Sequence, residues 1–193
     1  MELNKKYWDE TYLNKQTGWD VGYVVTPLKE YFDQLKDKSI RILIPGAGNA
    51  YEVEYLHQLG FTNIYLLDFA PTPIQNFIER NPSFPKKNIL EEDFFEHKGN
   101  YDLIIEHTFL TSIARNQRAN YAAKLSELLS EKGKLVGLLF NHEFPNNHPP
   151  YGGTPDEYLK MFIPHFKINI FETAYNSIKP RKNRELFIKL SKK

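Results

Sequence analysis

Two glycines and one aspartate, at fixed intervals along the chain, give the first indication of chemistry. Gly46 and Gly48 form a Gly-x-Gly turn after the apolar run 40–44, and Asp68 directly follows the next apolar run, 63–67. Glycines between a strand and a helix let the backbone approach a ligand closely. A carboxylate at the end of the following strand can accept hydrogen bonds from both hydroxyls of a ribose. We therefore predict a nucleoside-binding site; the alternatives are an ordinary tight turn and an acid that stabilises a helix dipole.

The nucleoside is not expected to belong to a nicotinamide or flavin dinucleotide. The fingerprint of those cofactors has a third glycine, and Tyr51 stands in its place here. An NAD-dependent reductase is an alternative, but Tyr121 and Lys124 have the wrong spacing for a Tyr-x-x-x-Lys pair on one helix face. A protein that binds the cofactor without catalysis is a second alternative, because its binding residues would look the same.

Acidic and aromatic residues follow the next two predicted strands. Asp93 and Phe94 come after a short apolar segment near 89–90, where an acid can bond the adenine amino group and a ring can pack on the base. Glu106 and His107 end the following apolar run. Open α/β sheets build their sites at the carboxyl ends of strands, so Glu106 is expected to balance a positive charge on the cofactor. His107 taken alone is also explained as a packed or solvated loop residue.

Alternating apolar runs and amphipathic stretches determine the predicted fold. Short runs that are hydrophobic on both faces are typical of parallel central strands. Strands are expected at 40–44, 63–67, 89–90, 101–105, 134–140, 166–173 and 185–190. Helices are expected at 52–59, 72–80 and 117–129, the last followed by a turn at 131–133. Right-handed crossovers then give an α/β fold, a mostly parallel seven-stranded sheet with helices on both faces.

The last two of these strands leave little room for a helix between them and are expected to pair antiparallel at the sheet edge. An antiparallel last strand distinguishes methyltransferase-type Rossmann-like folds from dinucleotide-binding ones. We expect a single domain over 1–193, with an N-terminal lid or helical segment at 1–39 and a Rossmann-like core at 40–193. The Pro-, Gly- and Asn-rich segment 141–155 is predicted to be a loop over the carboxyl edge of the sheet.

Composition argues against several classes of protein. Lys and Arg number 25 against 24 Asp and Glu, which argues against a nucleic-acid binder with a basic surface. The absence of cysteine removes disulfides, thiolate metal sites and a cysteine nucleophile. The charged start MELNKKYWDE shows no signal peptide, and no apolar run is long enough to span a membrane, so a cytoplasmic protein is expected. No metal is expected, because His142 and His148 fit no standard ligand spacing.

Several motifs, taken in order, resemble one family. Over about residues 7–190 the chain is similar to the thiopurine S-methyltransferases and, within them, to the plant-type halide and thiol methyltransferases. The segments that carry the resemblance are Thr17-Gly18-Trp19-Asp20 with Pro27, IPGAGNAYEVEYL, LLDFAPTPI, EEDFF, IEHTFLTSIARNQR, GGTPDEY and NSIKPRKNRE. The resemblance implies a class I methyltransferase fold that uses S-adenosylmethionine and releases S-adenosylhomocysteine.

The same resemblance assigns roles to residues. Those that would contact the cofactor are Trp19, Gly46, Gly48, Asp68, Phe69, Asp93, Phe94 and Glu106. The substrate would be contacted by Tyr23 in the lid segment and by His107 and Arg118. His107 and Arg118 are also the predicted catalytic residues.

Two departures from the family pattern concern the acceptor. Glu106-His107 replaces the family's Asp-Tyr pair, and Asp156 stands where the family's Gly-Gly-Pro-Pro-Tyr motif has its tyrosine, for which Tyr151 or Tyr158 could substitute. We predict a small, soft acceptor: a thiol, a halide, thiocyanate or a thiopurine-like compound. His107 is expected to help a thiol to ionise. Arg118 either holds an anionic acceptor or is a surface residue in the first turn of its helix. A monomer acting on a small molecule is expected.

Overall fold

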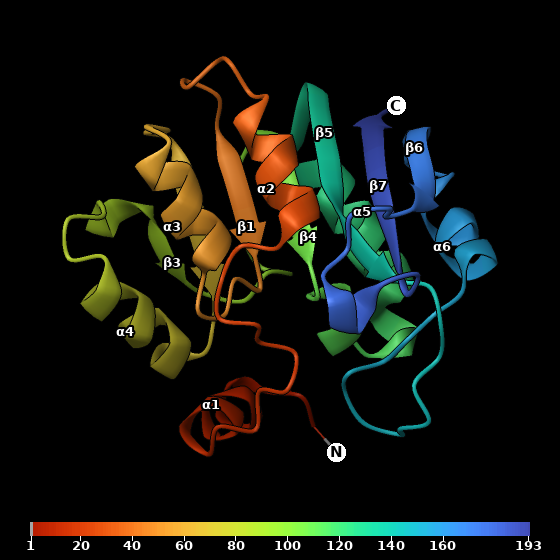
Figure 1. The fold of residues 1–193 in the computed structure, drawn as a ribbon, viewed down its shortest axis with the longest axis horizontal. Coiled ribbons are helices and arrows are strands. Elements are labelled where there is room, and N and C mark those ends of the chain that lie inside the picture. The colour runs from red at the N-terminus through yellow and green to blue at the C-terminus, as the bar shows by residue number, and fades with distance from the viewer. Residues whose placement is uncertain (1) are drawn as a thin grey trace. The chain divides into compact units, whose positions relative to one another are not determined.

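The computed structural model describes residues 2–193 as alternating helices and strands (Figure 1). The chain divides into two compact units, one ending at His97 and the other covering Lys98–Lys193. The elements of the first unit are α1 (Lys5–Leu13), α2 (Thr26–Asp33), β1 (Ile42–Pro45), α3 (Tyr51–Gln58), β2 (Ile64–Asp68), α4 (Pro71–Arg80), η1 (Lys86–Asn88) and β3 (Ile89–Glu91). Those of the second are β4 (Tyr101–His107), η2 (Leu110–Ser112), η3 (Arg115–Gln117), α5 (Arg118–Leu128), β5 (Leu129–Phe140), α6 (Pro155–Phe162), β6 (Phe166–Thr173), η4 (Lys179–Arg181) and β7 (Glu185–Lys192).

Three parallel strands form the sheet of the first unit. β1 pairs with β2, with Ile42 opposite Ile64, and β2 pairs with β3, with Leu66 opposite Ile89. All four residues of β1 are buried, as expected for a strand covered on both faces. Helix α3 packs against β2 and α4 against β3, so the predicted strand-helix alternation is confirmed here.

Two helices occupy much of the segment 1–39 that the sequence assigns to a lid or helical segment. Helix α1 begins at Asn4, whose side-chain oxygen accepts a hydrogen bond from the Tyr7 amide at 3.0 Å. Helix α2 begins with Pro27 in its first turn, where a missing amide proton costs nothing. Helix α1 packs against α4 and α2 against α3. The proposed division of a single domain at residues 39 and 40 stays a prediction.

The second unit contains the antiparallel part of the sheet. β4 and β5 pair in parallel, whereas β7 is antiparallel to both β5 and β6. The strand order in the described residues is β3-β2-β1-β4-β5-β7-β6, one sheet of seven strands. The predicted α/β fold with an antiparallel last strand is confirmed. Of the helices in residues 2–193, none has the length and hydrophobicity needed to cross a membrane.

The turn predicted at 131–133 is wrong. Helix α5 ends at Leu128, and β5 begins at the next residue and runs to Phe140. The pairing with β4 is irregular at this point, because β5 advances from Leu129 to Lys134 while β4 advances by only two residues. The residues predicted to turn are therefore a bulge within the strand.

The predicted loop 141–155 ends where α6 begins, at Pro155. The Thr154 hydroxyl caps this helix by accepting a hydrogen bond from the Glu157 amide at 3.3 Å. Acidic residues in the first turn stabilise the helix by interacting with the positive end of its dipole. Sequence reasoning missed this helix because its eight residues are too few for a clear helical pattern.

Gly137 of β5 lies directly opposite Glu106 of β4. A Cβ atom at this position would lie 2.2 Å from the Glu106 carbonyl oxygen and 2.5 Å from the Glu106 Cβ. Both contacts are with atoms of a paired strand, which cannot move aside without breaking the ladder. Position 137 is therefore restricted to glycine by close approach of the two strands.

We predict that Gly137→Ala lowers the free energy of unfolding by about 1–3 kcal/mol, because the added methyl group overpacks the strand pair. Urea denaturation measures this loss. Gly18→Ala is the matched control, because a Cβ at Gly18 meets no atom within 4 Å. Equal free energies of unfolding for the two variants would show that β4 and β5 accommodate the added methyl group without loss of stability.

Candidate functional site

The Gly-x-Gly turn joins β1 to α3 through left-handed backbone conformations. Gly46, Gly48 and Ala50 have φ angles of 58°, 53° and 58°. A Cβ at Gly48 would lie 2.3 Å from the hydroxyl oxygen of Tyr12. Glycine is therefore required at position 48 both by its backbone conformation and by the close contact with a tyrosine of α1.

Asp68 ends β2 and is bonded to this turn. The Gly48 amide donates a hydrogen bond to Asp68 Oδ2 at 2.8 Å, and the Ala70 amide donates to Oδ1 at 2.9 Å. Burial raises the pKa of the carboxyl, while these amides act in the opposite direction. The Phe69 amide is a third backbone group that lowers the pKa of this carboxyl. Contact of Asp68 with the hydroxyls of a ribose stays a prediction; Phe69 itself is partly buried.

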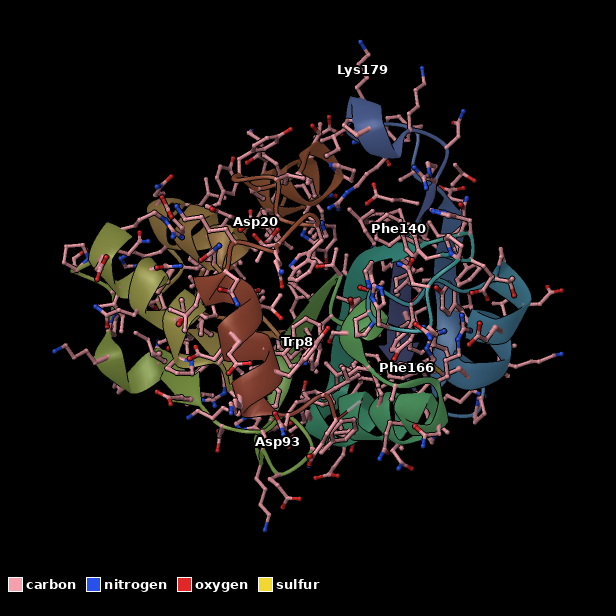
Figure 2. The ribbon with its side chains drawn as sticks, turned by 90° about the horizontal axis from the view of Figure 1, so that it is seen from below. Trp8, Asp20, Asp93, Phe140, Phe166 and Lys179 are labelled. Carbon is pink, nitrogen blue, oxygen red and sulfur yellow. The ribbon has the colours of Figure 1, made fainter. Side chains whose placement is uncertain are left out.

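An aromatic cluster from the N-terminal segment lies against the glycine turn. Trp8 and Tyr12 of α1 each meet the Trp19 ring edge-on, with centroids 5.8 and 6.1 Å apart (Trp8 is labelled in Figure 2). Burial, followed by the nearby Asp68 charge, raises the pKa of the Tyr12 hydroxyl. Sequence reasoning named Trp19 but missed Tyr12. The sequence feature that could have identified Tyr12 is its four-residue spacing from Trp8, which places the two rings on one helix face.

Asp20 connects the same segment to the glycine turn. The Asn49 side-chain amide donates a hydrogen bond to Asp20 Oδ2, and the Gly22 amide donates to Oδ1 at 2.8 Å. Arg80 of α4 donates to the Asn49 carbonyl oxygen from the other side. Tyr23, predicted to contact the substrate, lies just beyond and is 52% exposed. The segment around Asp20 is therefore attached to the predicted cofactor loop.

Asp93 and Phe94 follow β3 and differ in environment. Asp93 is exposed, and its Oδ1 accepts a hydrogen bond from the Phe95 amide at 2.8 Å. Phe94 is only 3% exposed and meets the Phe95 ring edge-on. The carboxylate is accessible to a ligand, as an adenine-binding role requires, whereas the phenyl ring is mostly packed in the protein.

Glu106 lies at the end of β4 and is 1% exposed. It accepts hydrogen bonds from the Tyr121 hydroxyl of α5 and from the Leu110 amide at 3.0 Å. Burial nevertheless raises the pKa of its carboxyl to about 7, because desolvation outweighs these bonds. The role of balancing a positive charge on the cofactor stays a prediction for this buried carboxyl.

Arg118 begins α5, and its guanidinium group is bonded within the protein. It donates to Glu157 Oε1 at 2.7 Å and to the carbonyl oxygens of Gly152 and Tyr151 at 2.8 and 3.3 Å. Its Nε atom is buried and has no hydrogen-bond partner in residues 2–193. The side chain holds the loop before α6, so the surface-residue alternative for Arg118 is wrong and a substrate contact stays a prediction.

His107, next to Glu106 on β4, is bonded to an arginine that sequence reasoning did not select. Arg181 Nη1 donates to His107 Nε2 at 3.0 Å. Arg181 belongs to the segment NSIKPRKNRE, one of the motifs that carry the family resemblance. The motif therefore included Arg181, but nothing in it indicated that this arginine is bonded to His107. Within the described part of the chain, no group of three or more His, Asp or Glu residues has a geometry that could hold a metal ion.

The fold is that of class I methyltransferases. A solved structure from Burkholderia thailandensis, 1,6-didemethyltoxoflavin-N1-methyltransferase with bound 1,6-didemethyltoxoflavin and S-adenosylhomocysteine, has the same fold: the TM-score is 0.79, at 15% sequence identity, over 98% of this chain and 87% of that one. The thiopurine S-methyltransferase (TPMT) family model matches residues 3–192. The chain therefore belongs to the thiopurine S-methyltransferase family, and the predicted enzyme class is confirmed.

Two relatives agree with this assignment. A probable thiol methyltransferase 2 from Arabidopsis thaliana is 27% identical over 167 residues, which cover 81% of this chain and 71% of the plant protein. A thiopurine S-methyltransferase from Photobacterium profundum is 20% identical over 179 residues, which cover 83% of each protein. The family resemblance inferred from the motifs is thus confirmed.

We predict that Glu106→Gln changes how stability depends on pH. The carboxyl pKa is 4.5 in its ordinary state and about 7 in the fold, so protonated Glu106 favours the fold below pH 4.5, and this contribution is lost as the pH rises through about 7. The loss is on the order of 3 kcal/mol. Urea denaturation between about pH 4.5 and 8 should show the variant gaining stability relative to wild type by this amount.

Glu131→Gln is the control for this experiment. Because Glu131 is exposed, its replacement should have little effect on how the free energy of unfolding depends on pH. Parallel stability curves for wild type and Glu106→Gln would mean that Glu106 ionises in the fold as readily as in the unfolded chain.

Proposed function

We propose that this protein transfers a methyl group from S-adenosylmethionine to a small, soft nucleophile: a thiol, a halide, thiocyanate or a thiopurine-like compound. Membership of the thiopurine S-methyltransferase family supports the reaction and its methyl donor. The names of the plant and bacterial relatives support a sulfur acceptor. The observation that carries the proposal is Asp68, a buried carboxyl at the end of β2 that is bonded to the backbone of the glycine turn.

The reaction is a direct displacement. An electron pair of the acceptor forms the new bond to the methyl carbon while the carbon–sulfonium bond breaks, and that bonding pair stays on sulfur to give S-adenosylhomocysteine. No oxidant or metal is needed for this balance. The protein's task is to align the acceptor and to keep water out.

Roles for individual residues are part of the proposal. Those assigned to the cofactor are Trp19, Gly46, Gly48, Asp68, Phe69, Asp93, Phe94 and Glu106. Tyr12 is added to them, because its hydroxyl lies against Gly48 and near Asp68. Tyr23, His107 and Arg118 are assigned to the acceptor. The near-equal numbers of basic and acidic residues support a small-molecule substrate and no nucleic-acid partner. A cytoplasmic monomer remains our expectation.

Asp68→Ala is predicted to weaken S-adenosylhomocysteine binding by about 1–3 kcal/mol, because it removes hydrogen bonds to a charged acceptor. Isothermal titration calorimetry measures the loss, with the exposed Glu79→Gln as control. NAD should give no binding heat. An unchanged dissociation constant in a folded Asp68→Ala protein would leave Asp68 with only its structural role.

The acceptor class is tested by a panel of hydrosulfide, thiocyanate, iodide and aryl thiols, with methylated product detected by mass spectrometry. Product from at least one of these soft acceptors is expected with S-adenosylmethionine as donor. Turnover of oxygen or nitrogen acceptors alone would contradict the proposed acceptor class. Binding of S-adenosylhomocysteine without turnover of any acceptor would favour a non-catalytic binding protein.

A further inference from the structure

The Arg181–His107 hydrogen bond determines which ring nitrogen of His107 carries a proton. Arginine is protonated at every pH at which proteins are studied and has no acceptor atom. When Arg181 Nη1 donates to His107 Nε2 at 3.0 Å, the lone pair of Nε2 must accept. The proton of the neutral ring is then on Nδ1. Neither nitrogen of this ring has a lone pair ready to take a proton from a substrate.

Arg181 is held in place by its own surroundings. It is 6% exposed, and its Nη1 atom also lies 3.2 Å from Oε1 of Glu185, which is 2% exposed. The Ser177 hydroxyl donates to the other Glu185 oxygen at 2.8 Å, and the guanidinium carbon lies 5.3 Å from the centre of the Phe140 ring. The arginine is therefore fixed by a buried ion pair and an aromatic face.

Lys179, on the same short helix, provides a contrast. Its side chain projects from η4 away from the ribbon (Figure 2), and it is exposed. A second arginine of the region, Arg184, donates to His142 Nε2 at 2.7 Å but is exposed. Only Arg181, of these three cations, combines burial with a carboxylate partner and a histidine at the end of β4.

The hydrogen bond with Arg181 selects the same tautomer. A proton on Nε2 would occupy the lone pair that accepts from Arg181 Nη1, and the bond would be lost. Glu185 contacts the same Nη1 atom of Arg181, at 3.2 Å, and neutralises the guanidinium group. Glu106, the neighbour on β4, accepts its hydrogen bonds from the Tyr121 hydroxyl and the Leu110 amide.

We infer that Arg181 is a positioning residue that fixes His107 as the Nδ1–H tautomer, so that residue 107 acts as a hydrogen-bond donor and not as a general base. The inference deepens the proposed function and, for its catalytic consequence, rests on it. It revises the role that the sequence suggested for His107. The acceptor then reaches the enzyme already ionised, and its own electron pair attacks the methyl carbon without prior proton transfer to His107.

The tautomer is measured directly on protein labelled with 15N-histidine. Long-range 1H–15N correlation spectra at about pH 7.5 distinguish protonated from unprotonated ring nitrogens, and loss of one set of signals in His107→Gln assigns residue 107 among the six histidines. Wild type should show a protonated Nδ1 and an unprotonated Nε2. Arg181→Met should shift the ring toward the Nε2–H tautomer that free histidine prefers in water.

Lys179→Met is the matched control and should leave the His107 signals unchanged, while Arg184→Met should alter only those of His142. A protonated Nε2 in wild type would overturn the inference, and so would a His107 pattern in Arg181→Met identical to wild type. If Arg181→Met does not fold, the wild-type spectrum still decides the tautomer and Glu185→Gln tests its support.

Turnover tests the catalytic consequence separately. Even where His107→Gln lowers the turnover of both acceptors, the ratio of thiol turnover to thiocyanate turnover at neutral pH should be the same as in wild type. A general base typically contributes a factor of about 10²–10⁴, so a fall of this ratio by about a hundredfold would mean that His107 does remove a proton. Failure of wild type to methylate any acceptor would overturn the proposed function, while the spectra would still decide the tautomer.

Discussion

The Asp68 carboxylate is the interaction on which the first unit's predicted binding site depends. By accepting hydrogen bonds from the amides of Gly48 and Ala70, it ties the end of β2 to the turn that follows β1. That turn contains three left-handed residues; two are glycines, which adopt this conformation readily, whereas Ala50 keeps it only because its surroundings enforce it. The position of Tyr12 against Gly48 follows from the shape of the turn. One buried acid therefore organises backbone, aromatic cluster and candidate ligand positions together.

Much of the fold could be predicted because its signals are local. A strand such as β1, buried along its whole length, corresponds to a continuous apolar run in the sequence. The glycine turn follows directly after that run, so its position is also visible in the sequence. The bulge in β5 and the short helix α6 depend instead on pairing and packing with distant residues. The contact of Tyr12 with Gly48 joins positions far apart in the chain, and no local pattern specifies such a contact.

In the candidate site, the sequence indicates which residues are present but not which groups they are bonded to. Sequence motifs identified Arg118 and His107 as polar groups at the right ends of their elements. They gave no means of knowing that Arg118 binds Glu157 and two carbonyl oxygens, or that His107 accepts a hydrogen bond from Arg181. Because a guanidinium group with several protein partners behaves differently from one held ready for a ligand, the chemistry of both residues depends on these long-range contacts.

The neighbouring positions 106 and 107 have a consequence for how a substitution at one of them affects the other. Successive side chains of a strand point to opposite faces, so Glu106 is directed to Tyr121 and Leu110 while His107 is directed to Arg181. Exchange of residue 107 thus leaves the bonds of Glu106 intact, and Gly137 holds the opposite strand close to Glu106. A substitution at position 107 therefore changes the contact with Arg181 and leaves the surroundings of Glu106 as they are.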